Sequence, residues 1–444
     1  MRNLWTLVHR WAGLATALFL IVSGLTGAVI SWDHEIDGWL NRKLYDTESR
    51  GPFKDPFVLA AAVEAQDPRA RVAYLPLGFE EGHASSYFVQ PRQDPATGKP
   101  YKLGYNQVFV DPVTAEIRGR RDSTAVSLKP ETLMPFLRKL HYTLHVPAMW
   151  GSDRVGHWIM GGIALVWLFD SFVAMYLTTP RRLRAKAAPE GAAATPHRDA
   201  ATWWSRWKPS WLLRWKAGGY KLNFDLHRAG GLWVWVLIIV IAFTSFSINL
   251  NREIFFPLLS MVSRTTPGPS ALVPLAPLGT RVEPVIGFVE IVDVARAEAA
   301  RRGWTTPLGG VFYNARGGFY NVSFFDRSTH DNSDGMGLSN LYLSAKDGSL
   351  ISSNQPWHGT AADVFAQLQL PLHGGRILGL TGRILMSVMG LVVAMLSVTG
   401  IVIWARKRRS RVMSRKRSQA LPAGGQAPGK AARRRHRQPH EAGV

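Results

Sequence analysis

Long apolar runs alternate with polar segments along the chain. Four runs are long enough to cross a bilayer as helices, which takes about 20 residues. They cover residues 11–32, 157–178, 229–250 and 381–404. Trp and Tyr side chains stand near the ends of these runs, where the membrane interface favours them. The pattern predicts an α-helical integral membrane protein with four transmembrane helices.

Two polar segments follow the first and third runs, and each predicts a small α+β domain. A helix-like stretch opens each segment, at 56–66 and at 283–302. Short runs of alternating apolar and polar residues follow, as in half-buried strands. These strand candidates lie at 71–77, 84–90, 107–121, 308–313, 319–325 and 341–353.

The two halves of the chain also resemble each other. V-H-R-W-A-G-L at 8–14 corresponds to L-H-R-A-G-G-L at 226–232, and each opens an apolar run. T-L-H at 143–145 and P-L-H at 371–373 stand before the second and fourth runs. We therefore expect two tandem repeats, each made of a helix, an inserted α+β domain and a second helix.

This organisation divides the chain into eight parts. In order they are the first helix, the first inserted domain, the second helix, a basic Trp-rich loop, the third helix, the second inserted domain, the fourth helix and a disordered basic tail. We expect their bounds at 1–32, 33–153, 154–178, 179–228, 229–250, 251–376, 377–404 and 405–444.

The distribution of charge predicts the orientation in the membrane. The chain has 53 Lys and Arg against 31 Asp and Glu, a net charge of +22. The whole excess lies in the first ten residues, in 179–228 and in 405–444. Basic loops stay in the cytoplasm, so both termini are expected there. Because the chain has no Cys, the membrane is expected to be the inner membrane of a bacterium. The two inserted domains then face the periplasm. No folded nucleic-acid reader accompanies the basic tail, which excludes a nucleic-acid function.

The loop before the third run carries four Trp residues at helical spacing. Trp203, Trp207, Trp211 and Trp215 recur every four residues with Arg and Lys between them, and Pro209 interrupts or restarts the helix. An amphipathic basic stretch of this kind lies on an anionic phospholipid surface. An aromatic cofactor box is the alternative.

Cysteine is absent, which excludes disulfides, iron–sulfur clusters, Cys-ligated zinc and haem attached through Cys. Any redox metal must then rely on other side chains. His9 and His227 occupy equivalent places at the cytoplasmic ends of runs one and three. His145 and His373 occupy equivalent places before runs two and four, and His141 lies one helical turn before His145.

Two histidine pairs at opposite faces of a four-helix bundle suit the axial positions of two b-type haems. Arg10 and Arg228 follow the inner pair and are candidates either to neutralise haem propionates or to contact phospholipid. Asp170 is an intramembrane charge and so a functional candidate, and His157 on the second run is a further possible ligand.

The residues resemble a known family, the bacterial PepSY-associated transmembrane proteins, which include inner-membrane iron-uptake proteins and ferric-siderophore reductases. The similarity covers the chain to about residue 408. It rests on the sequence around V-H-R-W-A-G-L, on L-H-Y-T-L-H, on N-F-D-L-H-R-A-G-G and on P-L-H-G-G. These four motifs lie in 8–41, 140–145, 223–235 and 371–407, and the apolar stretch at 163–182, which begins I-A-L-V-W-L-F-D, also matches.

The resemblance implies a four-helix di-haem protein with periplasmic PepSY-like domains. His9 and His227 match the histidines of the family's H-R motif, and His373 matches that of its L-H-x-G motif. The remaining ligand falls on His141 or on His145: the repeat favours His145, and the L-H-Y motif favours His141.

We therefore expect an electron conduit that reduces iron(III)-siderophores at the periplasmic face and releases iron(II). No G-x-G-x-x-G motif appears in 179–228 or in the tail, so a quinol or a separate cytoplasmic reductase is the expected electron donor. One alternative is a membrane-anchored PepSY protein that binds a peptidase or an envelope partner without redox activity. A transporter is a third possibility, but the predicted spans lack the pairs of broken helices that usually form a midplane site.

Overall fold

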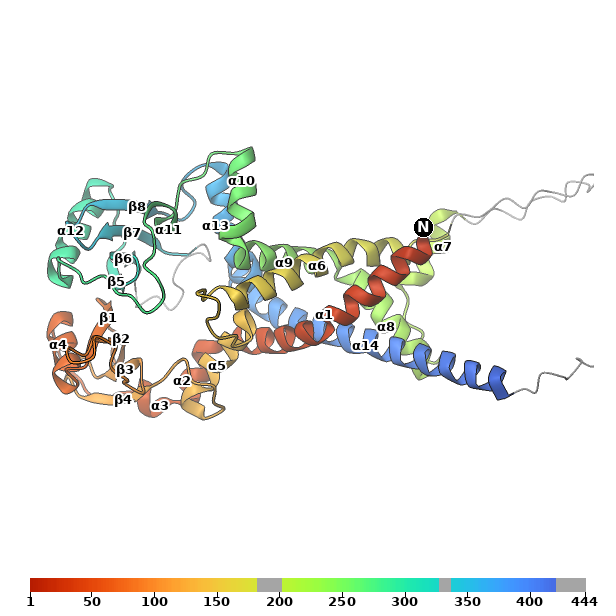
Figure 1. Cartoon of the computed structure of the whole chain (residues 1–444), viewed down its shortest axis with the longest axis horizontal. Coiled ribbons are helices and arrows are strands. Elements are labelled where there is room, and N and C mark those ends of the chain that lie inside the picture. The colour runs from red at the N-terminus through yellow and green to blue at the C-terminus, as the bar shows by residue number, and fades with distance from the viewer. Residues whose placement is uncertain (182–201, 327–336, 421–444) are drawn as a thin grey trace, which may run out of the picture.

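The computed structural model describes residues 1–181, 202–326 and 337–420. A bundle of long helices carries a β-sheet at one end, and the N-terminus lies at the other (Figure 1). We call the end next to the sheet the sheet end. The opposite end, where α1 begins and α14 ends, is the terminal end.

Four apolar segments form the bundle. Three are single helices long and apolar enough to cross a membrane, α1 (Arg2–Ile30), α6 (Val155–Thr178) and α14 (Gly379–Ala420). The fourth consists of α8 (Gly219–Trp233) and α9 (Trp235–Asn249), which are bent by 71° at Val234. α1 packs along α14, and α6 packs along α9. The protein is therefore a membrane protein with an inserted sheet domain.

The third predicted run differs from the structure in two ways. Its helix begins at Gly219, ten residues before the predicted start at 229, and it is not straight. The third span is therefore bent, whereas the expectation concerned pairs of broken helices. In the described chain the break occurs in one span only, whereas transporters of this kind carry broken helices at corresponding places in both halves.

Part of the predicted disordered tail is helical. α14 continues to Ala420, so residues 405–420 are helical rather than disordered. Lys and Arg are good helix formers, and they extend the apolar helix without a Pro or Gly to stop it. The rest of the predicted tail, and residues 182–201 of the predicted loop, lie outside the described residues.

One antiparallel sheet of eight strands has the order β4-β3-β2-β1-β5-β6-β7-β8. Its strands are β1 (Ala70–Pro76), β2 (Ser85–Pro91), β3 (Gln107–Val110), β4 (Ile117–Arg121), β5 (Leu308–Asn314), β6 (Phe319–Phe324), β7 (Ser339–Ser344) and β8 (Leu350–Asn354). The strands agree with the predicted runs. The expectation of two separate domains does not agree, because β1 pairs with β5 and joins the two segments into one sheet.

The core of the sheet domain lies between the strands and two helices, α4 (Pro56–Gln66) and α12 (Phe288–Arg301). The side chain of Asp55 caps α4 by accepting a hydrogen bond from the backbone nitrogen of Phe57 at 2.8 Å. Apolar side chains from both inserted segments share this core, among them Leu59, Tyr87, Ile291, Val311 and Tyr320.

Two helices lead from the sheet domain back to the bundle, α5 (Pro130–Thr143) and α13 (Ala361–Gly374). Shorter elements complete the described chain. They are α2 (Asp33–Leu40), α3 (Arg42–Tyr45), α7 (Trp203–Trp207), η1 (Lys208–Trp211), η2 (Asn251–Phe255), α10 (Phe256–Val262), α11 (Pro269–Leu272) and η3 (Arg376–Leu378).

A buried ion pair fixes the start of α5. Nη1 of Arg121 on β4 lies 2.9 Å from Oδ2 of Asp37 on α2, and both side chains are almost fully buried. The same Nη1 donates to the carbonyl of Glu131, and Asn41 donates to the carbonyl of Pro130. This network ties the first turn of α5 to the sheet and to the extension of α1.

Candidate functional site: two histidine pairs

At the terminal end, α1 and α8 bring two histidines together. The ring centroids of His9 and His227 lie 6.1 Å apart, with an angle of 46° between the ring planes. The bend after α8 allows this helix to run across the bundle while α9 stays packed on α6. The pair predicted from the V-H-R and L-H-R motifs is therefore present.

At the sheet end, α5 and α13 bring together a second pair, His141 and His373. Their ring centroids also lie 6.1 Å apart, with an angle of 50° between the planes. Each helix delivers its histidine in the last turn, and a left-handed residue then ends the helix, Leu144 after α5 and Gly375 after α13. α5 and α13 lie at the sheet end of the bundle, whereas α1, which carries His9 in its first turns, begins at the opposite end (Figure 1).

Hydrogen bonds fix the same tautomer in all four imidazoles. Nδ1 of His141 lies 3.0 Å from the carbonyl oxygen of Ser23, and Nδ1 of His227 lies 2.9 Å from that of Leu396. A carbonyl only accepts, so in both rings Nδ1 carries the proton and donates it. The lone pair is then left on Nε2.

The other two histidines follow the same rule. Nδ1 of His373 lies 3.1 Å from Oγ1 of Thr244, whose own proton goes to the carbonyl of Val240. Nδ1 of His9 lies 2.9 Å from a carboxylate oxygen of Asp170. Within the described chain, no hydrogen bond occupies Nε2 in any of the four rings.

The separation within each pair suits one metal ion between two imidazoles. A first-row metal lies about 2.0–2.1 Å from an imidazole nitrogen, so the centroids of two rings on opposite sides of it lie roughly 6.3 Å apart. Both observed separations are 6.1 Å. No cluster of three or more His, Asp or Glu side chains suited to a metal ion occurs among the described residues. Each pair thus offers two nitrogens, the number of axial ligands that a haem iron takes.

His145 is not part of the sheet-end pair. It follows Leu144 in the left-handed region, with φ of 55°, and its ring stacks on Phe136 at 4.6 Å. Its Nε2 donates to the carbonyl of Phe136 at 2.9 Å, and its Nδ1 is buried with no partner in the described structure. Of the two alternatives left open by the sequence, the structure places His141 opposite His373.

His157 is also apart from both pairs. Its ring stacks on Tyr142 at 5.8 Å, and its Nδ1 donates to Oδ1 of Asn249 at 3.1 Å. No other histidine of the described chain has a ring in contact with it.

Asp170 on α6 is the carboxylate partner of His9. Both of its oxygens lie within 3.0 Å of Nδ1 of His9, and its side chain is only 10 % exposed. Sequence reasoning singled out this intramembrane charge but did not connect it with His9. Such a carboxylate fixes the ring orientation and the tautomer of a metal-binding histidine.

The two arginines that follow the terminal-end histidines differ from each other. Arg228 is held by the fully buried carboxylate of Asp225 at 3.1 Å, and it donates to the carbonyl of Pro209 at 2.8 Å. Arg214 binds the same carboxylate at 2.7 Å. Arg10 makes no hydrogen bond or ion pair with any described residue. Of the two arginines predicted to bind an anion, Arg10 is therefore the one without a partner in the described chain.

Two glycines that the sequence did not single out lie against the paired rings. A Cβ on Gly27 would stand 2.9 Å from Cε1 of His141, and one on Gly400 would stand 3.1 Å from Cε1 of His227. Contacts this short do not fit beside an imidazole ring that is held in place. Gly27 and Gly400 each stand directly after a Thr that contacts the same ring, which is the signal that the sequence offered.

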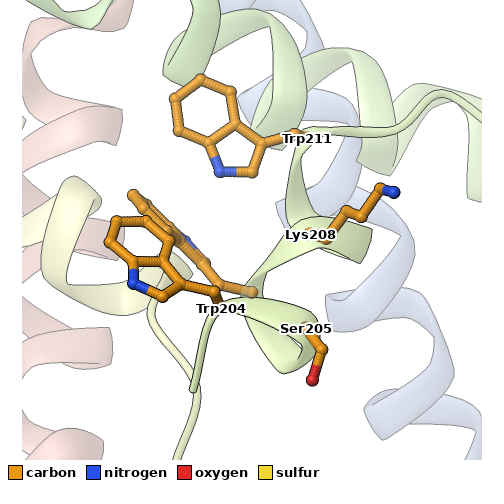
Figure 2. A pocket seen from close by; sticks show the side chains of 5 residues that line it. Trp204, Ser205, Lys208 and Trp211 are labelled. Carbon is orange, nitrogen blue, oxygen red and sulfur yellow. The ribbon is translucent and has the colours of Figure 1, made fainter. Parts of the chain in front are cut away.

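The Trp-rich segment folds into α7 and η1, which meet at Lys208 just before Pro209. Trp204, Trp207 and Trp211 line an open apolar pocket of about 360 Å³, with Lys208 beside it (Figure 2). Nε1 of Trp207 donates to Oγ1 of Thr178 at 3.2 Å and fastens the segment to the end of α6. The segment therefore lies at the terminal end of the bundle.

Comparison with known proteins assigns the family. A model of the PepSY-associated TM region matches residues 6–407 of the chain. The chain belongs to this family. No curated protein matches the chain closely enough to serve as a relative. The match includes both histidine pairs, the sheet and all four apolar segments of the PepSY-associated TM protein.

Proposed function

We propose that this protein carries electrons across a membrane between two b-type haems, one held by each histidine pair. The observation that carries the proposal is the shared geometry of the pairs, with centroids 6.1 Å apart and the hydrogen bonds of the described chain on Nδ1 rather than on Nε2 in each ring. Each haem, when bound, supplies an iron that alternates between iron(III) and iron(II). The protein contributes the ligands, their orientation and the separation of the two sites.

Matching spacings support two tandem repeats. Seventeen residues separate His9 from Thr26 in the first half and His227 from Thr244 in the second. Thr26 contacts His141 at 3.1 Å, and Thr244 contacts His373 at 3.1 Å. Each pair takes one histidine from each half, as a pseudo-twofold arrangement requires.

The basic terminal end is the cytoplasmic end in this proposal, and the sheet faces the periplasm of a bacterium. A quinol or a cytoplasmic reductase gives electrons to the His9 and His227 site, and iron(III) in a siderophore takes them at the sheet end. Hard oxygen ligands hold iron(II) less well than iron(III), so reduction releases the metal. A quinol that becomes a quinone gives up two electrons and two protons and thereby reduces two iron(III) ions.

The Trp-rich segment supports an anionic phospholipid as a further partner. Trp204 is 68 % exposed beside Lys208, and the segment is fastened where α6 ends. Amphipathic rings and cations at this level suit the headgroup region of the inner leaflet.

Spectroscopy of the purified protein tests the electron-transfer proposal. We expect protein from haem-replete cells to contain two low-spin b-type haems per chain, counted as the pyridine haemochrome after dithionite reduction. His227→Ala should lower the count to one. A well-folded protein without haem would contradict the proposal and would favour a PepSY protein that binds a peptidase or an envelope partner.

A further inference from the structure

The four paired histidines differ in the charge of their hydrogen-bond partners. His227, His141 and His373 each donate from Nδ1 to neutral oxygens, namely backbone carbonyls and threonine hydroxyls. His9 alone among the four donates to a carboxylate, that of Asp170. The terminal-end site therefore carries a negative charge in direct contact with a ligand, and the sheet-end site does not.

Asp170 is the carboxylate in contact with a paired histidine among the described residues. The titratable side chains that act electrostatically on His227 are His9 and Asp170. Within the described chain, no carboxylate forms a hydrogen bond or an ion pair with His141 or His373.

Several arginines near the two ends of the bundle are held in ion pairs, whereas Arg10, which follows His9, makes no ion pair with a described residue. Arg214 and Arg228 share the buried carboxylate of Asp225 at the terminal end. Two further arginine–carboxylate pairs lie toward the sheet end, Arg138 with Asp33 and Arg383 with Glu35.

We propose that Asp170 makes the terminal-end site the weaker electron acceptor of the two, so that electrons run downhill from His9 and His227 toward His141 and His373. The inference rests on the proposed haems at both pairs. It assigns Asp170 as a positioning residue that acts through His9.

The physical reason is electrostatic. Iron(III) carries one more positive charge than iron(II), so a nearby carboxylate favours the oxidised state. A hydrogen bond from Nδ1 to a carboxylate also makes Nε2 a stronger donor to the metal. Both effects are larger in an apolar bundle than in water, because the low dielectric screens charges weakly.

The transfer itself balances as a single electron. One electron leaves the terminal-end site, whose iron returns from iron(II) to iron(III), and the sheet-end iron goes from iron(III) to iron(II). The proton on Nδ1 of His9 stays in its hydrogen bond, and no atom changes place.

A redox titration of single-site variants tests the inference. His141→Ala leaves the terminal-end haem alone, and His9→Ala leaves the sheet-end haem alone, so each midpoint potential is measured without overlap. We expect the lower potential at the terminal end. Asp170→Asn in the His141→Ala background keeps an acceptor beside His9 but removes the charge. It should raise the equilibrium constant for reduction about tenfold, which is 59 mV for a one-electron couple.

Two further variants separate charge from packing. Asp170→Glu should restore a low potential. Thr399→Val removes a neutral acceptor from His227 at the same site while the Leu396 carbonyl remains, so the potential should hardly move. An unchanged potential in Asp170→Asn, or an equal shift in Thr399→Val, would overturn the inference.

If Asp170→Asn loses its haem, the inference is still tested by the midpoint potentials of His141→Ala and His9→Ala. A terminal-end potential equal to or above the sheet-end potential would refute the inference. A wild-type protein that binds no haem is a different result, because it refutes the proposed function itself.

Discussion

The ring centroids of His141 and His373 lie 6.1 Å apart, although the two residues are 232 positions apart in the sequence. Both rings come from the last turn of a helix that returns from the sheet to the bundle. His145 lies beyond the end of α5, where the left-handed residue Leu144 has already turned the chain away. The end of the helix, rather than the spacing of the L-H motif, decides which histidine enters the pair.

His141→Ala should therefore remove the sheet-end haem, while His145→Ala should keep it. The first substitution deletes a ring that faces His373, and the second deletes one that stacks on Phe136. The measurement is the haemochrome count of each purified variant, with about one haem expected for His141→Ala and two for His145→Ala.

His157→Ala is the matched control for this comparison, because its ring stacks on Tyr142 rather than on a paired histidine. A sheet-end haem that survives in His141→Ala and disappears in His145→Ala would show that the helix end is differently placed in the haem-loaded protein.

Gly27→Ala should disturb the same site by steric contact. Its Cβ would stand 2.9 Å from Cε1 of His141, so the ring must move out of line with His373. Overpacking of this kind costs about 1–3 kcal/mol. We expect weaker retention of one haem, measured as haem loss to apomyoglobin over time.

Gly162→Ala on α6 is its control, since a Cβ there meets nothing within 4 Å. Equal rates of haem loss from the two variants would argue against a tight contact at Gly27.

Asp37→Asn should lower the stability of the sheet domain and loosen the start of α5. It leaves Arg121 buried with an uncompensated charge, and breaking a buried pair costs about 3–5 kcal/mol. Thermal unfolding followed by intrinsic fluorescence should show a lower midpoint than in the wild type.

The exposed pair of Arg296 and Asp293 offers the comparison. Both side chains are about two-thirds exposed, so Asp293→Asn should change stability by roughly 0–1 kcal/mol. A larger loss in Asp293→Asn than in Asp37→Asn would contradict the role given to the buried pair.

The absence of native cysteine allows a clean test of orientation. Ala96→Cys places one thiol in an exposed turn of the sheet domain, and Arg409→Cys places one near the terminal end of α14. A maleimide that cannot cross membranes should label Ala96→Cys in intact spheroplasts and Arg409→Cys only after lysis. The reverse pattern would invert the proposed direction of electron transfer.

Removal of the exposed aromatic and cationic groups of the Trp-rich segment should weaken lipid binding. We expect Trp204→Ala combined with Lys208→Gln to co-purify with less anionic phospholipid, measured by native mass spectrometry. Trp39→Ala is the control, because Trp39 is equally exposed, at 67 %, but lies on α2 at the sheet end. Similar losses in both would point to a general effect of exposed tryptophan.

Local patterns predicted most of the fold. Alternation placed the strands, and the apolar runs placed α1, α6 and α14, because side-chain periodicity follows directly from backbone geometry. The 71° bend at Val234 carries no comparable signal, since neither Pro nor Gly occupies the break. The pairing of β1 with β5 could not be predicted either, because it depends on the tertiary arrangement of two segments that are far apart in the sequence.

Repeated sequence motifs predicted some residues of the candidate site. Residues whose place in the site depends on tertiary packing could not be predicted. His9, His227 and His373 were found from matching motifs in the two halves. The choice of His141 over His145 depends on the left-handed turn at Leu144, which spacing alone does not reveal. The contact of Asp170 with His9 joins two separate helices, so the sequence showed a buried charge without its partner.

The single sheet has a consequence for how the chain holds together. Leu75 of β1 stands opposite Val311 of β5, so the backbone of one inserted segment is hydrogen-bonded to that of the other. Each histidine pair also takes one ring from each half. The two halves thus behave like the subunits of an obligate heterodimer that happen to share one polypeptide, and neither half alone contains a complete pair. Any change that separates them should abolish both sites in a single step.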